Sequence, residues 1–139
     1  MKKYFGAFIL LALAVSCKKD KDKDCSFSEA NLVGSYKITA LKYKASASAT
    51  EVDEFALFSA CEKDDIITFN SNHTMTYTDA GTVCTPAGND TGVWTYINSN
   101  TINVDGDVST IAAFDCSGMT VTISGTTAGE LTTITLARQ

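Results

Sequence analysis

The sequence predicts an all-β domain that folds as an eight-stranded up-and-down antiparallel β-barrel. Thr alone accounts for 19 of the 139 residues, while helix-forming Leu, Glu and Lys are modest in number, and this balance favours strands. From Leu32 onward, short runs of β-branched and aromatic residues recur between turn signals. Eight such runs can be counted, and tight turns join most of them.

Each run carries the signature of a strand with one buried face. Apolar and polar residues alternate in several of them, as in Met119/Val121/Ile123. Connections such as Asn98-Ser99-Asn100 are typical of hairpins. Closing the sheet removes the unpaired edges that an open meander would leave, and an open sandwich is the alternative. The expected strands are 33–43, 65–70, 73–78, 92–97, 101–104, 107–114, 119–124 and 130–138.

The amino-acid composition is typical of one globular domain. The chain is 45% hydrophobic and 19% charged with a single Pro, which excludes a disordered or collagen-like polymer. The formal net charge of -5 gives no basic surface for a nucleic-acid backbone. We therefore expect a monomer without a nucleic-acid partner.

The N-terminal segment has the layout of an export signal. Lys2 and Lys3 precede an apolar run over 4–15, which is too short to span a bilayer. The end of this run, Leu13-Ala14-Val15-Ser16-Cys17, resembles the lipobox of bacterial lipoproteins. The resemblance implies cleavage before Cys17 and lipidation of that cysteine.

These features divide the chain into three parts. We expect a lipoprotein signal peptide at 1–16, the lipidated Cys17 with a charged flexible tether at 17–30, and the barrel domain at 31–139. The tether begins with alternating Lys and Asp residues that have nothing apolar to bury. The expected location is the outer membrane, on its periplasmic side or at the cell surface, with the membrane as partner through the lipid on Cys17.

The other four cysteines are expected to form disulfides, because an exported chain meets an oxidising environment. Cys61 lies shortly before the second expected strand and Cys84 shortly after the third, so both lie at one end of the barrel. Cys25 precedes the first strand and Cys116 lies in the turn after the sixth, at the opposite end. Mixed pairs would have to cross the strand length, beyond the limit of about 7 Å between Cα atoms. The predicted disulfides are Cys61–Cys84 and, less strongly determined, Cys25–Cys116.

Several short motifs together resemble the lipocalin-like domain family of bacterial lipoproteins, over residues 32–138. Lipocalins open with Gly-x-Trp, and Tyr36 stands in place of that Trp. The resemblance implies an eight-stranded barrel that binds a small apolar molecule. The motifs are Leu32-Val33-Gly34-Ser35-Tyr36, Cys61-Glu62-Lys63-Asp64-Asp65 leading into Ile66-Ile67-Thr68-Phe69, Cys84, Thr91-Gly92-Val93-Trp94, and Arg138 in the final strand.

The first and last strands of a closed barrel are neighbours. Tyr36 and Arg138 then fall near the end opposite the long loops, where the guanidinium can stack on the ring. We expect this contact to be structural and to close the barrel.

Two long connections, 44–64 and 79–91, share one rim and mark the end where a ligand could enter. Phe55, Leu57 and Phe58 form an apolar cluster in the first loop, which either fills the top of the core or covers a ligand. Trp94 is expected to begin its strand near this rim, as a core residue or a ligand contact.

The function predicted from these features is a lipid-anchored envelope lipoprotein that binds a small hydrophobic ligand at this rim. The alternative is a non-enzymatic envelope or surface interaction module with a filled barrel and no ligand cavity.

The sequence offers few candidate catalytic residues. His73 is the only His and sits at a hairpin turn, and the sequence holds no nucleophile elbow, phosphate loop or Cys-x-x-Cys pair. Glu62, Asp64 and Asp65 form an acidic cluster that we expect to be a solvated loop. We therefore expect no enzyme activity, no catalytic residue, no metal and no cofactor.

Overall fold

Nine strands, one α-helical turn and one 3-10 helix make up the computed structural model, which describes residues 25–139. Within that range, no helix has the length and apolar character needed to cross a bilayer. The elements are α1 (Glu29–Leu32), β1 (Gly34–Lys44), β2 (Val52–Asp53), η1 (Phe55–Leu57), β3 (Ile66–Phe69), β4 (Thr74–Thr78), β5 (Asp90–Asn98), β6 (Thr101–Val104), β7 (Asp107–Asp115), β8 (Gly118–Ser124) and β9 (Leu131–Arg138).

The strands form a closed antiparallel barrel. From β3 to β9 each strand pairs with the next, and β1 pairs with both β3 and β9. The eight-stranded barrel predicted from the sequence is therefore confirmed. β2 is an additional short strand, which pairs with β1 through Tyr43 opposite Val52 and Lys42 opposite Asp53.

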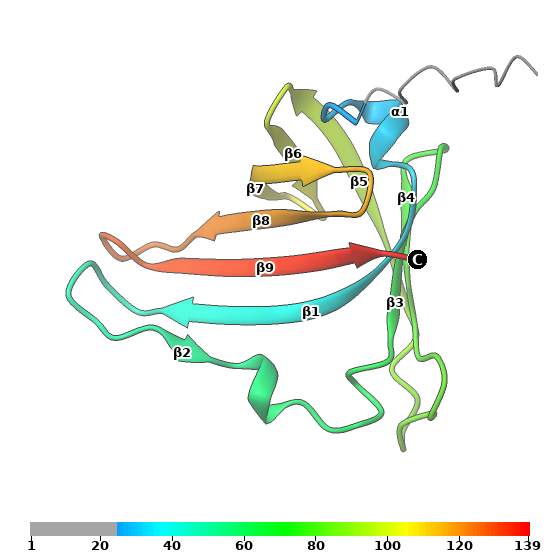
Figure 1. Cartoon of the computed structure of the whole chain (residues 1–139), viewed down its shortest axis with the longest axis horizontal. Helices are drawn as coiled ribbons and strands as arrows, with labels where there is room; N and C mark the ends of the chain where they lie inside the picture. Colours follow the sequence, from blue (N-terminus) through cyan, green and yellow to red (C-terminus); the bar gives the residue numbers. More distant parts are fainter. Residues whose placement is uncertain (1–24) are drawn as a thin grey trace, which may run out of the picture.

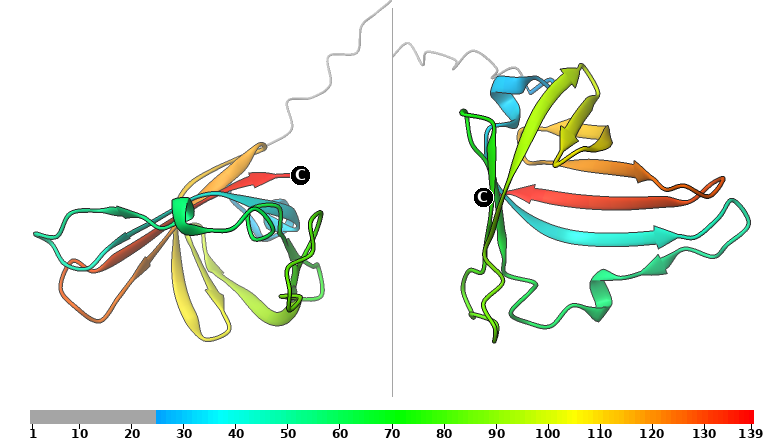
Figure 2. Two further views of the ribbon diagram at one scale, coloured as in Figure 1. Left: turned by 90° about the horizontal axis from the view of Figure 1, so that it is seen from below. Right: turned by 180° about the vertical axis from the view of Figure 1, so that it is seen from behind.

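The barrel is unevenly shaped because β1 uses its two edges differently. It pairs with β3 only over Gly34–Tyr36, but with β9 from Tyr36 to Lys44. Beyond Tyr36, β1 leaves β3 and runs with β8 and β9 as a three-stranded arm (Figure 1 and Figure 2). A register shift between Ile38 and Ala40 marks the start of this arm.

The two ends of the barrel differ in their connections. We call the end with residues 25–33 and the turns 70–73, 99–100 and 116–117 the base. The opposite end, with the connections 45–65, 79–89, 105–106 and 125–130, is the rim. All three base turns are short, and the two longest connections lie at the rim.

The core fills the base half of the barrel. The ring of Phe69 lies edge-on to Tyr36 at 5.9 Å and to Trp94 at 5.7 Å. Trp94 is 1% exposed, and its indole Nε1 donates to the carbonyl of Asn70. The fully or nearly fully buried apolar residues are Leu32, Tyr36, Phe69, Trp94, Ile102, Ile111, Met119, Val121 and Leu136.

The expected position of Trp94 near the rim is wrong. β5 begins at Asp90, opposite Tyr77, two residues earlier than expected. Trp94 therefore lies further along the strand, where its N–H donates to the carbonyl of His73 in a base turn. The indole belongs to the core of the base.

The folded domain also begins earlier than residue 31. Cys25 is disulfide-bonded to Cys116 with Cα atoms 5.0 Å apart, which confirms this predicted pair. Phe27 packs its ring against Tyr96 and Phe114, with centroids 5.5 and 5.3 Å away. The segment 25–30 is thus part of the base. Residues 1–24, which include the expected signal peptide and Cys17, lie outside the described residues.

One guanidinium closes the base. Arg138 Nη1 donates to the Asn31 carbonyl at 2.7 Å and to the Tyr36 hydroxyl at 3.1 Å, and Nη2 donates to the Val33 carbonyl at 2.6 Å. The Tyr36 hydroxyl in turn donates to the carbonyl of Leu32. Arg138 also lies over the Tyr36 ring, 5.5 Å from its centroid. The last strand is therefore tied to both the first strand and the segment before it.

The substitution Arg138→Met is expected to destabilise the protein by about 2–4 kcal/mol, because it removes three charge-assisted hydrogen bonds and leaves part-buried carbonyls without a donor. Equilibrium urea unfolding of the oxidised protein measures the change. Lys42→Met is the matched control, since its exposed ion pair with Glu51 is worth about 0–1 kcal/mol. Equal losses in the two variants would contradict a special role for Arg138.

Candidate functional site

The two long rim loops are joined covalently. Cys61 and Cys84 form a disulfide with Cα atoms 5.3 Å apart, which confirms the predicted pair. The bond links the connection before β3 to the connection after β4. The rim is thereby held together by a link that does not depend on the core.

A buried carboxylate orders the second of these loops. Asp79 is 7% exposed, and its carboxylate oxygens accept the N–H of Cys84 at 3.1 Å and the N–H of Gly88 at 2.9 Å. The backbone N–H of Asp79 donates to the side chain of Asn89 at 3.1 Å. One side chain thus holds both halves of the 79–89 loop.

The structure corrects the expected solvated acidic cluster at Asp64 and Asp65, while Glu62 is exposed as predicted. Asp65 is 6% exposed, and its carboxylate accepts the Tyr77 hydroxyl and the backbone N–H of Ala80. Asp64 accepts the N–H of Thr82 at 2.8 Å. These two carboxylates are structural acceptors for the 79–89 loop. Among residues 25–139, no group of three His, Cys, Asp or Glu side chains is placed to hold a metal ion.

Burial raises the pKa of Tyr77 well above its usual value of 10.0, and the adjacent Asp65 carboxylate raises it further. The hydroxyl therefore stays protonated as the donor to Asp65. In the unfolded chain the same hydroxyl ionises near pH 10. Its contribution to stability is thus complete below that pH and is lost as the pH rises above it.

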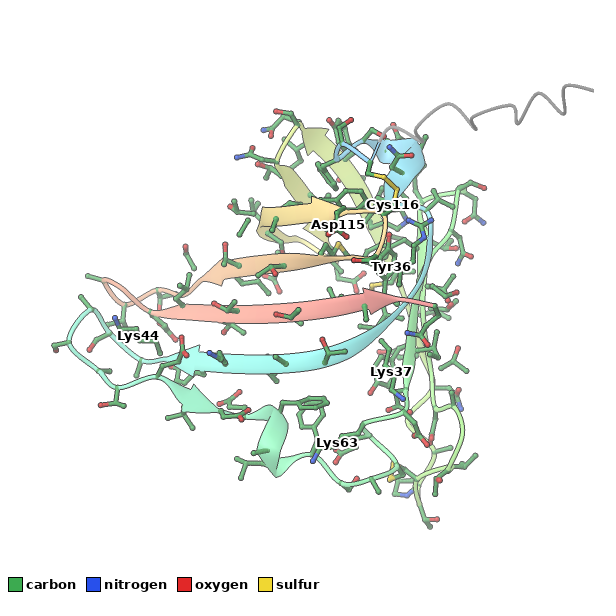
Figure 3. The ribbon with its side chains drawn as sticks, in the orientation of Figure 1. Tyr36, Lys37, Lys44, Lys63, Asp115 and Cys116 are labelled. Carbon is green, nitrogen blue, oxygen red and sulfur yellow. A yellow bond between two sulfur atoms is a disulfide. The ribbon has the colours of Figure 1, made fainter. Side chains whose placement is uncertain are left out.

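The apolar cluster of the first loop lies alongside β1. Glu54 donates its N–H to the carbonyl of Leu41, so η1 begins beside the edge of the arm. The rings of Phe55 and Phe58 lie 5.6 Å apart, and the ammonium of Lys63 lies 5.4 Å from the Phe55 centroid (Figure 3). Leu57 is 79% exposed, so it does not fill the top of the core.

The inner wall of the arm continues the apolar surface of the core toward the rim. On β8, Met119 and Val121 are buried while Ile123, two residues nearer the rim, is half-buried. Leu41 and Ile134 are directly opposite each other on β1 and β9, and both are half-buried. Burial thus falls toward the rim while the apolar character is kept. We call Leu41, Ile123 and Ile134 the arm wall.

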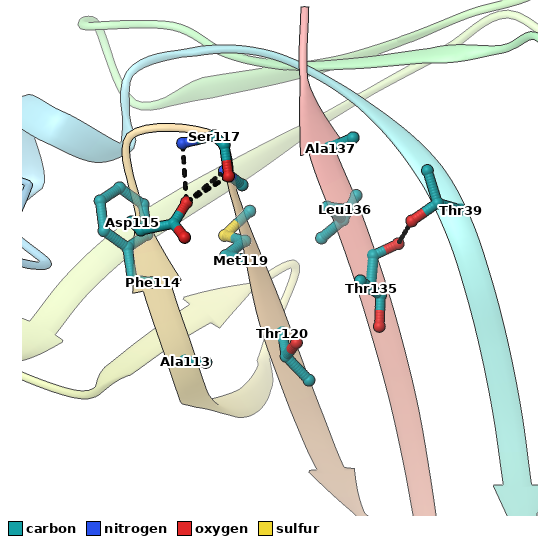
Figure 4. A pocket seen from close by; sticks show the side chains of 11 residues that line it. Thr39, Ala113, Phe114, Asp115, Ser117, Met119, Thr120, Thr135, Leu136 and Ala137 are labelled. Carbon is teal, nitrogen blue, oxygen red and sulfur yellow. Dashed lines mark hydrogen bonds between the residues drawn. The ribbon is translucent and has the colours of Figure 1, made fainter.

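A shallow groove of about 290 Å³ runs over β7, β8, β9 and β1, where Ala113, Gly118 and Ala137 leave space between strands (Figure 4). Asp115 borders it, and its carboxylate accepts the hydroxyl and the N–H of Ser117. Both hydrogen bonds lower the pKa of Asp115, and the bond from the Ser117 hydroxyl has the larger effect. The carboxylate is therefore engaged in the turn. The sequence analysis missed this groove, although small residues at outward positions could have signalled it.

His73 lies at the base, at the opposite end of the barrel from the two long rim loops. Its Nε2 is 3.2 Å from a carboxylate oxygen of Glu29, and its ring centroid is 5.1 Å from that of Trp94. Its backbone has φ of 65°, as the tight hairpin turn requires. The residue joins α1 to the β3–β4 turn.

A closed eight-stranded antiparallel barrel with a packed base and loops gathered at the other end is suited to binding at that end. The family model for the lipocalin-like domain matches residues 32–136. The protein therefore belongs to the lipocalin-like domain family, whose members are generally binding proteins. No curated protein and no solved structure matches the chain.

Asp79→Ala is expected to loosen the 79–89 loop and to cost about 1–3 kcal/mol, because it removes the acceptor of two part-buried N–H groups. Amide hydrogen exchange at Cys84 and Gly88 should accelerate before global unfolding. Asp90→Ala is the control, since the exposed Asp90 accepts only from its neighbour Thr91. Unchanged exchange at both amides in Asp79→Ala would show that the disulfide alone orders the loop.

Proposed function

We propose that the protein is a lipid-anchored envelope lipoprotein whose barrel binds a small hydrophobic molecule at the rim. The observation that carries this proposal is the arm wall. Leu41, Ile123 and Ile134 face the same side of three neighbouring strands and remain half-buried. An apolar surface beside a packed core gains stability when an apolar ligand covers it.

The rim loops support the same proposal. The Cys61–Cys84 bond and the Asp79 carboxylate order these loops, and ordered loops lower the entropy cost of binding. Phe55 and Phe58 lie where the first loop adjoins β1, so they are the loop residues best placed to contact a ligand on the arm wall. Leu57, directed to solvent, could cover a bound ligand only after the loop moves.

Trp94 is not included in this binding site. The indole is buried among Phe69, His73 and the Asn70 carbonyl at the base. Its contribution is to fill the half of the barrel that a ligand would otherwise occupy. The proposed ligand therefore sits in the mouth and does not reach the bottom of the barrel.

An interaction module that uses the outside of the rim loops is the second candidate. Leu57 and Val83 support it, because they are 79% and 60% exposed. Neither the first nor the second candidate involves a catalytic step, a metal or a cofactor.

The anchor is proposed from the sequence. The lipobox-like end of the apolar run places Cys17 where a lipid would be attached, and the charged residues 18–24 would separate the barrel from the membrane. The proposed location is the outer membrane, on the periplasmic side or at the cell surface.

Ile123→Gln is expected to weaken binding of a dansyl-labelled fatty acid about tenfold, because an unpaired amide on the arm wall costs ~1–3 kcal/mol when the ligand covers it. Fluorescence titration of the full chain measures the affinity. Thr122→Gln is the matched control, since Thr122 is adjacent on β8 and faces the opposite side. Equal affinities in both variants would rule out the arm wall, and no binding by the unmodified protein would favour the interaction module.

Cys17→Ser is expected to abolish lipidation, because serine cannot carry the thioether-linked lipid. Intact-mass measurement should show acyl groups on the unmodified chain and none on the variant. Detergent phase partitioning is compared only for variant chains whose mass shows loss of residues 1–16, and these should move to the aqueous phase. An unmodified chain without acyl groups would contradict the anchor.

A further inference from the structure

We propose that the base of the barrel faces the membrane and that the rim faces away from it. The partner of the base is the lipid bilayer that carries the anchor. The inference rests on the lipidation of Cys17 proposed above, and adds which surface each partner meets.

The described part of the chain begins at a fixed point on the base. Cys25 is bonded to Cys116 in the turn between β7 and β8, and Phe27 packs between Tyr96 and Phe114. Cys116 lies beside α1 at one end of the molecule (Figure 3). The tether must therefore leave the barrel from the base.

The length of the tether favours one orientation. Eight peptide steps separate Cys17 from Cys25, and a flexible chain of that length has a root-mean-square end-to-end distance of about 15 Å. β5 has nine residues and β1 has eleven, which at a strand tilt of about 35–45° correspond to roughly 21–29 Å along the barrel axis. A tether fixed at the base therefore keeps the base closer to the bilayer than the rim.

The chemistry of the two ends agrees with this orientation. The base turns 70–73, 99–100 and 116–117 are short and hold one ionisable side chain, His73, which faces Glu29, so their polar and largely uncharged surface suits a position beside lipid head groups. Four of the six exposed large apolar side chains lie at or beside the rim, namely Val52, Leu57, Val83 and Val108. The other two lie beside base turns, Ile97 before the turn 99–100 and Val93 opposite Thr74. The side chains suited to apolar contacts thus lie mainly at the end remote from the tether.

This orientation restricts what the rim can bind. A ligand or partner then arrives from the aqueous side, because the arm wall faces away from the bilayer that holds the anchor. The rim then takes its hydrophobic ligand from solution or from another protein, and does not extract it from the anchoring membrane.

Energy transfer to a labelled bilayer tests the orientation. Single cysteines are introduced into the full chain at exposed turn positions, Ser99→Cys at the base and Ser48→Cys at the rim, and each is labelled with the same fluorophore. The lipidated proteins are placed in phosphatidylethanolamine and phosphatidylglycerol vesicles with an acceptor on the head groups. The transfer rate from position 99 should exceed that from position 48 at least about tenfold, because the rim lies roughly 20–30 Å further away.

A longer tether provides the control. A second copy of residues 18–24 should lower transfer from position 99 and reduce the difference between the two labels. Equal transfer from both positions with the native tether, or more from position 48, would overturn the orientation while leaving the anchor intact. Absence of acyl groups by intact mass, with no transfer from either label, would overturn the anchor and the orientation together.

Discussion

The contacts of Arg138 hold together the parts of the chain that close the barrel. Eight strands form a closed ring only if each pairs on both sides, and β1 pairs with β3 over Gly34–Tyr36 alone. The guanidinium binds two carbonyls of the preceding segment and the Tyr36 hydroxyl at this point. Because the β1–β3 pairing is confined to the base, the rest of β1 is free to diverge with β8 and β9 as the arm.

The different pairing of β1 at its two ends explains why the interior is packed at the base, whereas toward the rim it stays apolar but is less deeply buried. Tyr36, Phe69 and Trp94 meet edge to face under α1 and exclude water from the base. At the rim, order comes from a disulfide and from buried carboxylates that accept backbone N–H groups of the 79–89 loop. Loops fixed in this way need no apolar core beneath them, which leaves apolar side chains available for binding.

The sequence was sufficient for the strand order and both disulfides, because hairpin parity fixes which connections share an end of the barrel. It misplaced Trp94, since Asp90 and Thr91 resemble loop residues, and only pairing with Tyr77 extends β5 back to them. The expectation that Asp65 is solvated was also wrong. Burial of a carboxylate depends on hydrogen-bond donors such as the N–H of Ala80, which lie far along the chain and cannot be recognised from local sequence. Alternation with Met119 and Val121 is enough to place Ile123 on the inner face, but Leu41 joins the arm wall only through the register shift between Ile38 and Ala40, which no local pattern reveals.

The Cys25–Cys116 bond determines how the domain carries mechanical load. Without it, a pull on the N-terminal side would pass through α1 to β1 alone. With the bond in place, the force also enters at the turn between β7 and β8, and passes into two further strands that are each paired on both sides. Three strands then share the load that the first strand would otherwise bear by itself.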